Sequence, residues 1–160
     1  MKLEQSHQPA KIDQRIHENI LFLIISVSVI GFLLHLIWEY VQCSPLFIHL
    51  KTSPTPWSMI RATLGDVAIF WSSYIVVAAF RKSLYWPWTS TSLMSWMMLV
   101  FISAAIAEVI EYFAINSQLW TYNSTNPTIS GVSVVPLFQM ATINPLTLII
   151  TKKLLELIKK

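Results

Sequence analysis

Four apolar runs dominate the chain and limit what it can fold into. They cover approximately residues 20–43, 62–80, 93–115 and 133–151. Each run is close to the roughly 20 residues that an α-helix needs to cross a hydrocarbon core of ~30 Å. Because 54% of the residues are hydrophobic and only 12% are charged, the composition excludes a soluble globular domain. The sequence predicts an all-α, polytopic membrane protein built as a four-helix transmembrane bundle.

The segments around the runs are too short to form another domain. Residues 1–19 are predicted to be a polar N-terminal segment, residues 20–151 a single transmembrane domain, and residues 152–160 a basic tail. The first run is longer than the apolar part of a signal peptide and lacks an A-x-A cleavage site, so we expect it to be retained as a helix.

Lysine and arginine are distributed unequally between the two sides of this topology. With the N-terminus inside, only Lys51 and Arg61 fall on the outer side. The basic residues on the inner side are Lys2, Lys11, Arg15, Arg81, Lys82, Lys152, Lys153, Lys159 and Lys160. Since cytoplasmic segments carry the excess of positive charge, both termini are predicted to be cytoplasmic, in the cell (inner) membrane. The net charge of +3 is then explained by topology, and no nucleic-acid partner is implied.

Half of the eight acidic residues fall inside the predicted spans: Glu39, Asp66, Glu108 and Glu111. Counting 1.5 Å per residue along each helix places all four in the outer half of the bilayer, at a depth shared with His35 and Gln139. Ionisable groups inside a membrane are costly and are candidates for function.

Spacing along the helices sharpens this prediction. His35, Glu39 and Gln42 share one helix face at i, i+4 and i+7, and Glu108 and Glu111 share a face at i, i+3. We expect these two faces to line one cavity that opens toward the outer side. Asp66 and Gln139 should contribute to the same cavity.

Each acid also has a structural explanation. Glu39 or Glu111 alone could reach the interface from a helix end, and Asp66 could complement the dipole at the start of its helix. Four acids and one histidine at the same depth favour a functional pocket over these separate explanations.

Residues 111–139, "EYFAINSQLWTYNSTNPTISGVSVVPLFQ", contain an acid, then Trp120-x-Tyr122, a glycine and a Pro-Leu pair in that order. This order resembles the small polytopic lycopene cyclases and carotenoid hydratases. The resemblance implies an isoprenoid substrate and a supporting role for Trp120 and Tyr122. In that family a paired glutamate follows Pro-Leu. Phe138 and Gln139 stand there in this chain, so acid catalysis from the last helix is not expected.

Three hypotheses for function follow, and the residues leave open whether the chain is an enzyme. In the first, the pocket binds or modifies a membrane lipid or isoprenoid, with Glu39, Glu108 and Glu111 as acid and base. The supporting residues are then His35, Gln42, Asp66, Trp120, Tyr122 and Gln139.

The second hypothesis is binding or transport of a cation or of protons, and any metal would be held by His35, Glu39, Glu108 and Glu111. The third is a non-catalytic subunit that pairs its acids with a membrane-protein partner or a second copy of the chain. The single cysteine, Cys43, excludes a disulfide within the chain and a cysteine-based zinc site. The sequence identifies no cofactor.

Overall fold

The computed structural model describes residues 9–51, 53–89 and 92–158. This part of the chain is mostly helical, as the apolar runs predict. The elements in chain order are α1 (Pro9–Leu46), β1 (Phe47–His49), α2 (Pro56–Arg81), α3 (Trp86–Thr89), α4 (Leu93–Asn116), β2 (Trp120–Tyr122), β3 (Thr128–Ile129), β4 (Val132–Ser133) and α5 (Val135–Ile158).

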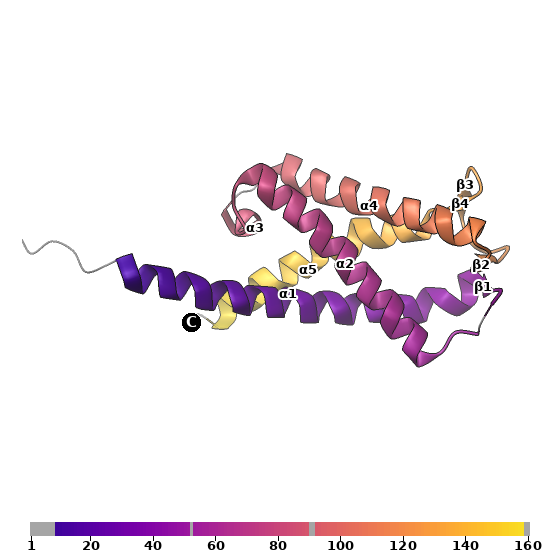
Figure 1. Ribbon diagram of the computed structural model, residues 1–160, viewed down its shortest axis with the longest axis horizontal. Helices are drawn as coiled ribbons and strands as arrows, with labels where there is room; N and C mark the ends of the chain where they lie inside the picture. Colours follow the sequence, from indigo (N-terminus) through magenta and orange to yellow (C-terminus); the bar gives the residue numbers. More distant parts are fainter. Residues whose placement is uncertain (1–8, 52, 90–91, 159–160) are drawn as a thin grey trace, which may run out of the picture.

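The four long helices pack along their lengths. α1 contacts α2 and α5, and α4 contacts the same two helices. The four short strands gather at one end of this assembly, whereas α3, the start of α1 and the end of α5 lie at the other end (Figure 1). We call these the strand end and the α3 end. Gly31 of α1 faces Thr147 of α5, whose Cγ2 would be in van der Waals contact, at 3.4 Å, with a Cβ atom added to the glycine.

The helices extend beyond the apolar runs. α1 begins at Pro9 rather than at residue 20, and α5 ends at Ile158 rather than at residue 151. Lysine, glutamine and glutamate are good helix formers, so the helix continues into the polar residues on either side of an apolar run. Lys2, Lys159 and Lys160, on which part of the topology prediction depends, lie outside the described residues.

Three helices of the described chain are long and apolar enough to cross a membrane: Ile20–Leu46 within α1, Pro56–Arg81 and Leu93–Asn116. The prediction of four such spans is therefore supported only in part. α5 has 24 residues, but polar side chains including Gln139 and Asn144 interrupt its apolar sequence. The three spans indicate a membrane-embedded protein.

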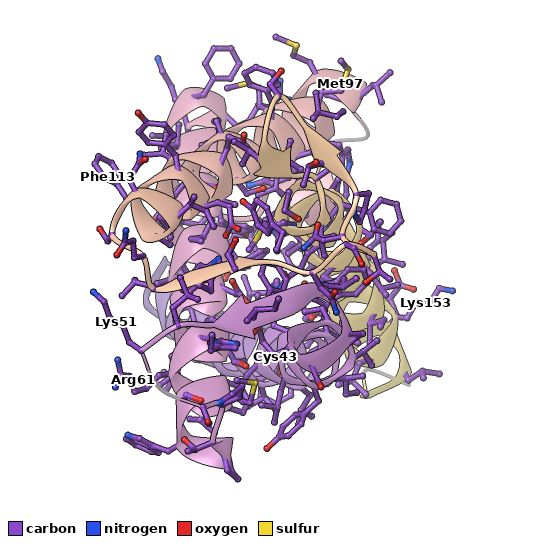
Figure 2. All side chains as sticks on the ribbon, turned by 90° about the vertical axis from the view of Figure 1, so that its right-hand side faces the viewer. Cys43, Lys51, Arg61, Met97, Phe113 and Lys153 are labelled. Carbon is purple, nitrogen blue, oxygen red and sulfur yellow. The ribbon has the colours of Figure 1, made fainter. Side chains whose placement is uncertain are left out.

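The outward faces of the long helices agree with this location. Large apolar side chains project away from the protein, among them Ile37, Phe101 and Phe113. Phe101 is 76% exposed. Figure 2 shows Phe113 and Met97 projecting outward from α4. Apolar surface on this scale is suited to lipid rather than to water.

Two short antiparallel strand pairs close the strand end, and the sequence analysis did not predict them. β1 pairs with β2, which sets Phe47 opposite Tyr122 and His49 opposite Trp120. β3 and β4 form a hairpin around Ser130 and Gly131, whose φ angles of 52° and 84° suit the two-residue turns of such hairpins. The connection after α1 is thus held to the connection after α4.

An aromatic core fills the α3 end. Trp86 and Tyr74 are almost completely buried, with ring centroids 5.7 Å apart, and Trp96 packs 5.4 Å from Trp86. The Tyr74 hydroxyl donates a hydrogen bond to the Leu84 carbonyl. Aromatic pairs at these separations add to the stabilisation from packing itself. This end of the helix assembly is therefore densely filled.

Candidate functional site

A cavity of about 490 Å³ lies between α1, α2, α4 and α5 at the strand end. Its wall combines apolar side chains with buried or half-buried groups that can form hydrogen bonds. Six of them are Glu39, Gln42, Asp66, Glu111, Trp120 and Gln139, and Cys43, His49 and Ser58 also line the wall. The cavity is formed by the last turns of α1 and α4 and by the first halves of α2 and α5. Because neighbouring helices are antiparallel, residues far apart in the sequence meet at the strand end.

α1 presents Glu39 and Gln42 to the cavity, on the face that the i, i+3 spacing predicts. The Gln42 side-chain amide donates to Oε1 of Glu39 at 2.6 Å. The Trp38 indole donates to Oε1 of Gln42, also at 2.6 Å. The amide oxygen of Gln42 thus accepts from Trp38 and its amide nitrogen donates to Glu39. These two bonds fix the orientation of the Gln42 side chain beside the Glu39 carboxyl group.

Gln139 of α5 connects the other helices. Its Nε2 lies 2.8 Å from Oδ2 of Asp66 and 3.0 Å from Nδ1 of His35. Its Oε1 lies 3.4 Å from Nε2 of Gln42. Gln139 is only 2% exposed, so these neighbours satisfy its amide group without solvent.

The position of the Gln139 amide determines the tautomer of His35. Since Gln139 donates to Nδ1 of His35, that nitrogen is an acceptor and the proton of the neutral ring is on Nε2. Nε2 then donates to Oδ1 of Asn144, 3.2 Å away. Nδ1 of His35 also lies 3.6 Å from Oδ2 of Asp66. We call His35, Glu39, Gln42, Asp66, Gln139 and Asn144 the amide–histidine network.

Glu39 and Asp66 meet across the cavity wall. Their carboxyl groups lie near enough to interact electrostatically. Neighbouring carboxyl groups away from water disfavour the ionisation of both, so such a pair can share one proton. A pair of this kind can supply both an acid and a base at a single position.

Glu111 and Glu108 lie against β2. Oε1 of Glu111 accepts a hydrogen bond from the Trp120 indole at 3.1 Å. Burial raises the pKa of the Tyr122 phenol to about 12, and the nearby charges of Glu111 and Glu108 add to this shift. Oε2 of Glu108 is buried without a hydrogen-bond partner in the described part of the chain.

These positions correct the expected arrangement of the acids. Glu39 and Glu111 line one cavity, but Glu108 does not line it. Glu108 precedes Glu111 by three residues, and a helical step of this size displaces the side chain by about 60° and 4.5 Å. This displacement is enough to turn Glu108 away from the space between α1 and α2 and toward the region of Tyr122.

Cations and a thiol surround the outer part of the cavity. Lys51 and Arg61 are exposed and line its mouth, and Figure 2 shows both on one flank of the strand end with Cys43 deeper in the protein. Sγ of Cys43 lies 3.1 Å from Nε2 of His49. Burial lowers the pKa of His49 below its usual value.

The sequence analysis missed Asn144 and assigned Lys51 and Arg61 only to topology. Asn144 is completely buried and hydrogen-bonded to His35. Its signal was an amide inside an apolar helix, because a buried amide costs free energy unless it is hydrogen-bonded. Lys51 and Arg61 could have been linked to the site because the sequence places them on the same predicted side as the acids of the spans.

Within the ranges that the structure describes, no group of three or more His, Cys, Asp and Glu side chains is arranged to hold a metal ion. The conditional metal set of His35, Glu39, Glu108 and Glu111 does not assemble. His35 is engaged by amide groups of α5, and Glu108 lies outside the cavity.

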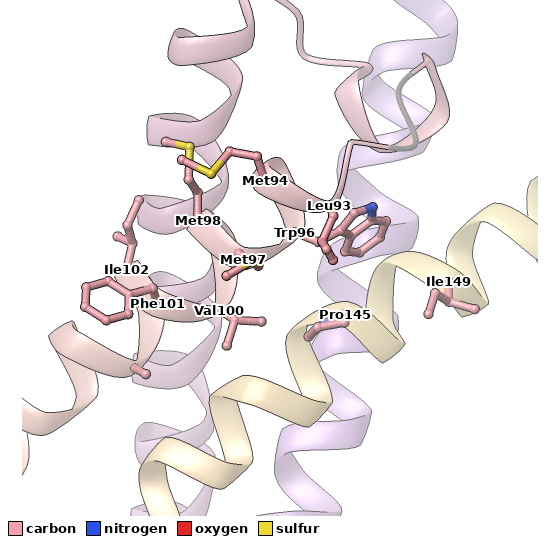
Figure 3. A pocket seen from close by; sticks show the side chains of 11 residues that line it. Leu93, Met94, Trp96, Met97, Met98, Val100, Phe101, Ile102, Pro145 and Ile149 are labelled. Carbon is pink, nitrogen blue, oxygen red and sulfur yellow. The ribbon is translucent and has the colours of Figure 1, made fainter.

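A second hollow of about 820 Å³ opens on the flank formed by α4 and α5 (Figure 3). Met97, Val100 and Phe101 of α4 line it together with Pro145 and Ile149 of α5. No charged side chain lines it. A surface of this kind can accommodate lipid chains but offers no group for proton transfer.

Comparison of the chain with protein-family models, with curated proteins and with solved structures found no significant match. The resemblance of residues 111–139 to the lycopene cyclases and carotenoid hydratases therefore stays a prediction. The chemistry of the site has to be interpreted from its own residues.

Proposed function

We propose that this protein binds a lipid or isoprenoid in the cavity at the strand end and modifies it by acid/base chemistry. The observation that carries the proposal is the convergence of three carboxyl groups from three helices. Glu39 of α1, Asp66 of α2 and Glu111 of α4 line one cavity whose remaining wall is largely apolar. An apolar wall favours a hydrocarbon ligand, and the carboxyl groups supply proton donors and acceptors.

The Glu39–Asp66 pair is the centre of the proposed chemistry. Its protonated member donates a proton to the ligand, and its ionised member accepts one, so the reaction leaves the protonation of the pair unchanged. Gln42 and Gln139 hold the two carboxyl groups through their side-chain amides. His35 orients Gln139 and is a positioning residue. Glu111 is the third group in reach of the ligand, and Glu108 has no direct role.

For the topology, we propose that all four long helices cross the membrane and that both termini are cytoplasmic. The start of α1 and the end of α5 lie at the same end of the protein (Figure 1), in agreement with an even number of crossings. The bias of basic residues then assigns the α3 end to the cytoplasm and the cavity to the outer half of the bilayer.

Lipid profiling of cells tests the function. Membrane lipids from a strain that produces the protein are compared by mass spectrometry with those of a deletion strain and of strains with Asp66→Asn, Glu39→Gln or Glu111→Gln. Glu156→Gln, an exposed substitution at the far end of α5, is the control. We expect Asp66→Asn and Glu39→Gln to reproduce the deletion profile, and Glu156→Gln the wild-type profile. Wild-type profiles from both cavity variants, beside an altered deletion profile, would refute the proposed chemistry.

One observation favours a second candidate, the movement of protons. His35 contacts the Asp66 side of the network through Nδ1 and Asn144 through Nε2, as a group does that relays a proton from one side to the other. Proton flux in proteoliposomes distinguishes the candidates. Flux that His35→Gln abolishes supports a relay, whereas the lipid reaction needs no flux.

A further inference from the structure

The cavity has a positively charged mouth above a carboxyl-lined interior. Lys51 and Arg61 both line it, and neither forms an ion pair with a carboxyl group within the described residues. Both side chains are exposed, so their charges are available to a ligand. Arginine binds phosphate through two parallel hydrogen bonds and lysine binds it as a compact charge. This mouth therefore suits an anionic group.

The cavity also reaches the flank of the protein between α2 and α4. Ala62 and Gly65 of α2 and Ile110 of α4 are exposed and line the cavity at the same time. A Cβ atom added to Gly65 would have no other atom within 4 Å, so the space beside this residue is open. We call the gap at these three residues the lateral opening. In a membrane it faces lipid chains.

Access along the helix axis is restricted by contrast. The strand pair β1–β2 crosses the strand end, and the Leu50 amide donates to the Leu119 carbonyl at 3.1 Å beside it. Asn123 adds a backbone bond to the Leu46 carbonyl. A ligand that came in past these segments would have to separate paired backbone groups. The lateral opening requires no such change.

We infer that the ligand is a lipid with a phosphate headgroup, which enters through the lateral opening and places its phosphate at Lys51 and Arg61. This inference rests on the proposed function and names its substrate class. Asp66 follows Arg61 by five residues on the same helix, about 7.5 Å deeper at 1.5 Å per residue. The Glu39–Asp66 pair then meets the atoms that join the headgroup to the chain, while the rest of the chain extends into the bilayer.

Binding measurements on the purified full-length protein test this inference separately from any reaction. Native mass spectrometry from detergent micelles compares phosphatidic acid with diacylglycerol of identical chains. We expect phosphatidic acid to bind at least tenfold more strongly. We expect millimolar inorganic phosphate not to displace it, because the chain contributes to binding. Equal binding of the two lipids would overturn the headgroup assignment, and displacement by inorganic phosphate would overturn the assignment to a lipid.

Variants locate the two parts of the site. The double variant Lys51→Gln and Arg61→Gln should lose at least tenfold in affinity for phosphatidic acid, whereas Lys153→Gln, which removes an exposed charge from α5, should not. Gly65→Phe should obstruct the lateral opening and weaken binding. The matched control is Ala68→Phe, which adds the same ring to an exposed position of α2 outside the cavity. Unchanged affinity in the double variant would overturn the role of the cations, and equal effects of Gly65→Phe and Ala68→Phe would overturn the lateral route.

Asp66→Asn separates this inference from the proposed function. It removes the acid/base pair but not the cations, so it should abolish the lipid reaction and still bind phosphatidic acid within about threefold of the wild type. If Asp66→Asn leaves cell lipids unchanged while phosphate-dependent binding persists, the proposed chemistry fails and the ligand class stands. If the reaction is lost but diacylglycerol binds as well as phosphatidic acid, the proposed chemistry stands and the phosphate headgroup assignment fails.

Discussion

The α3 end and the strand end are built from the same helices but use their interior differently. At the α3 end, Trp86 and Tyr74 fill the space between helices with closely packed, tilted rings. At the strand end, glutamine and carboxyl side chains surround a hollow of about 490 Å³. Dense packing is the main source of helix association in lipid, where burial from water contributes little. We therefore expect the α3 end to contribute most of the stability, which would allow the strand end to keep an open polar cavity.

The largest effect expected from this comparison is the loss of Trp86. Trp86→Ala should lower the free energy of unfolding by about 3–5 kcal/mol, because a completely buried indole leaves a space that its neighbours cannot fill. Trp57→Ala is the matched control, since Trp57 is 65% exposed at the strand end. Unfolding in detergent at increasing denaturant concentration measures both. Equal losses from the two variants would show that the aromatic core is not the main source of stability.

The second effect is smaller and lies in the amide–histidine network. His35→Leu leaves Oδ1 of Asn144 and Nε2 of Gln139 short of a partner, which should cost about 1–3 kcal/mol. Adding Asn144→Leu to His35→Leu should cost less than the sum of the two single changes, because the double variant removes both members of one hydrogen bond. If the losses in free energy of unfolding from the two single variants add up to the loss from the double variant, the His35–Asn144 contact is contradicted.

The smallest effect is a dependence on pH at the mouth of the cavity. Burial lowers the pKa of His49, so as the pH falls the unfolded chain binds a proton before the folded chain does. The stability that depends on a neutral His49 is thus complete above the usual pKa of 6.5 and is lost as the pH falls below it. The melting temperature of the wild type should fall more between pH 7.5 and pH 5.5 than that of His49→Gln. Parallel decreases would exclude His49 as the cause.

The helices could be predicted from the sequence because apolar runs of membrane length have few alternatives. That Glu39, Asp66 and Gln139 lie at one level of the helix assembly could be predicted as well, since residue number along a helix fixes height. Rotation about the helix axis could not, as Glu108 shows by lying outside the cavity that Glu111 lines. Two residues at i, i+3 share a face only approximately, and neighbouring helices decide which of them points inward.

The short strands could not be predicted either. Phe47–His49 and Trp120–Tyr122 are three residues long, which is too short for an alternating pattern to be recognised. Their pairing is also a contact between distant segments. The role of Asn144 depends in the same way on a contact, because its hydrogen-bond partner, His35, lies on a distant helix.

The β1–β2 pair has a consequence for the order of assembly. Its two strands are separated in the chain by the whole of α2 and α4, so Phe47 cannot meet Tyr122 until α4 has been synthesised and inserted. Contacts between segments far apart in the chain bear the largest cost of loop closure and tend to form late. The β1–β2 pair at the strand end of the cavity is therefore among the last parts to form during biogenesis. A chain halted just before β2 would contain α1, α2 and α4, with the strand end of the cavity still uncovered.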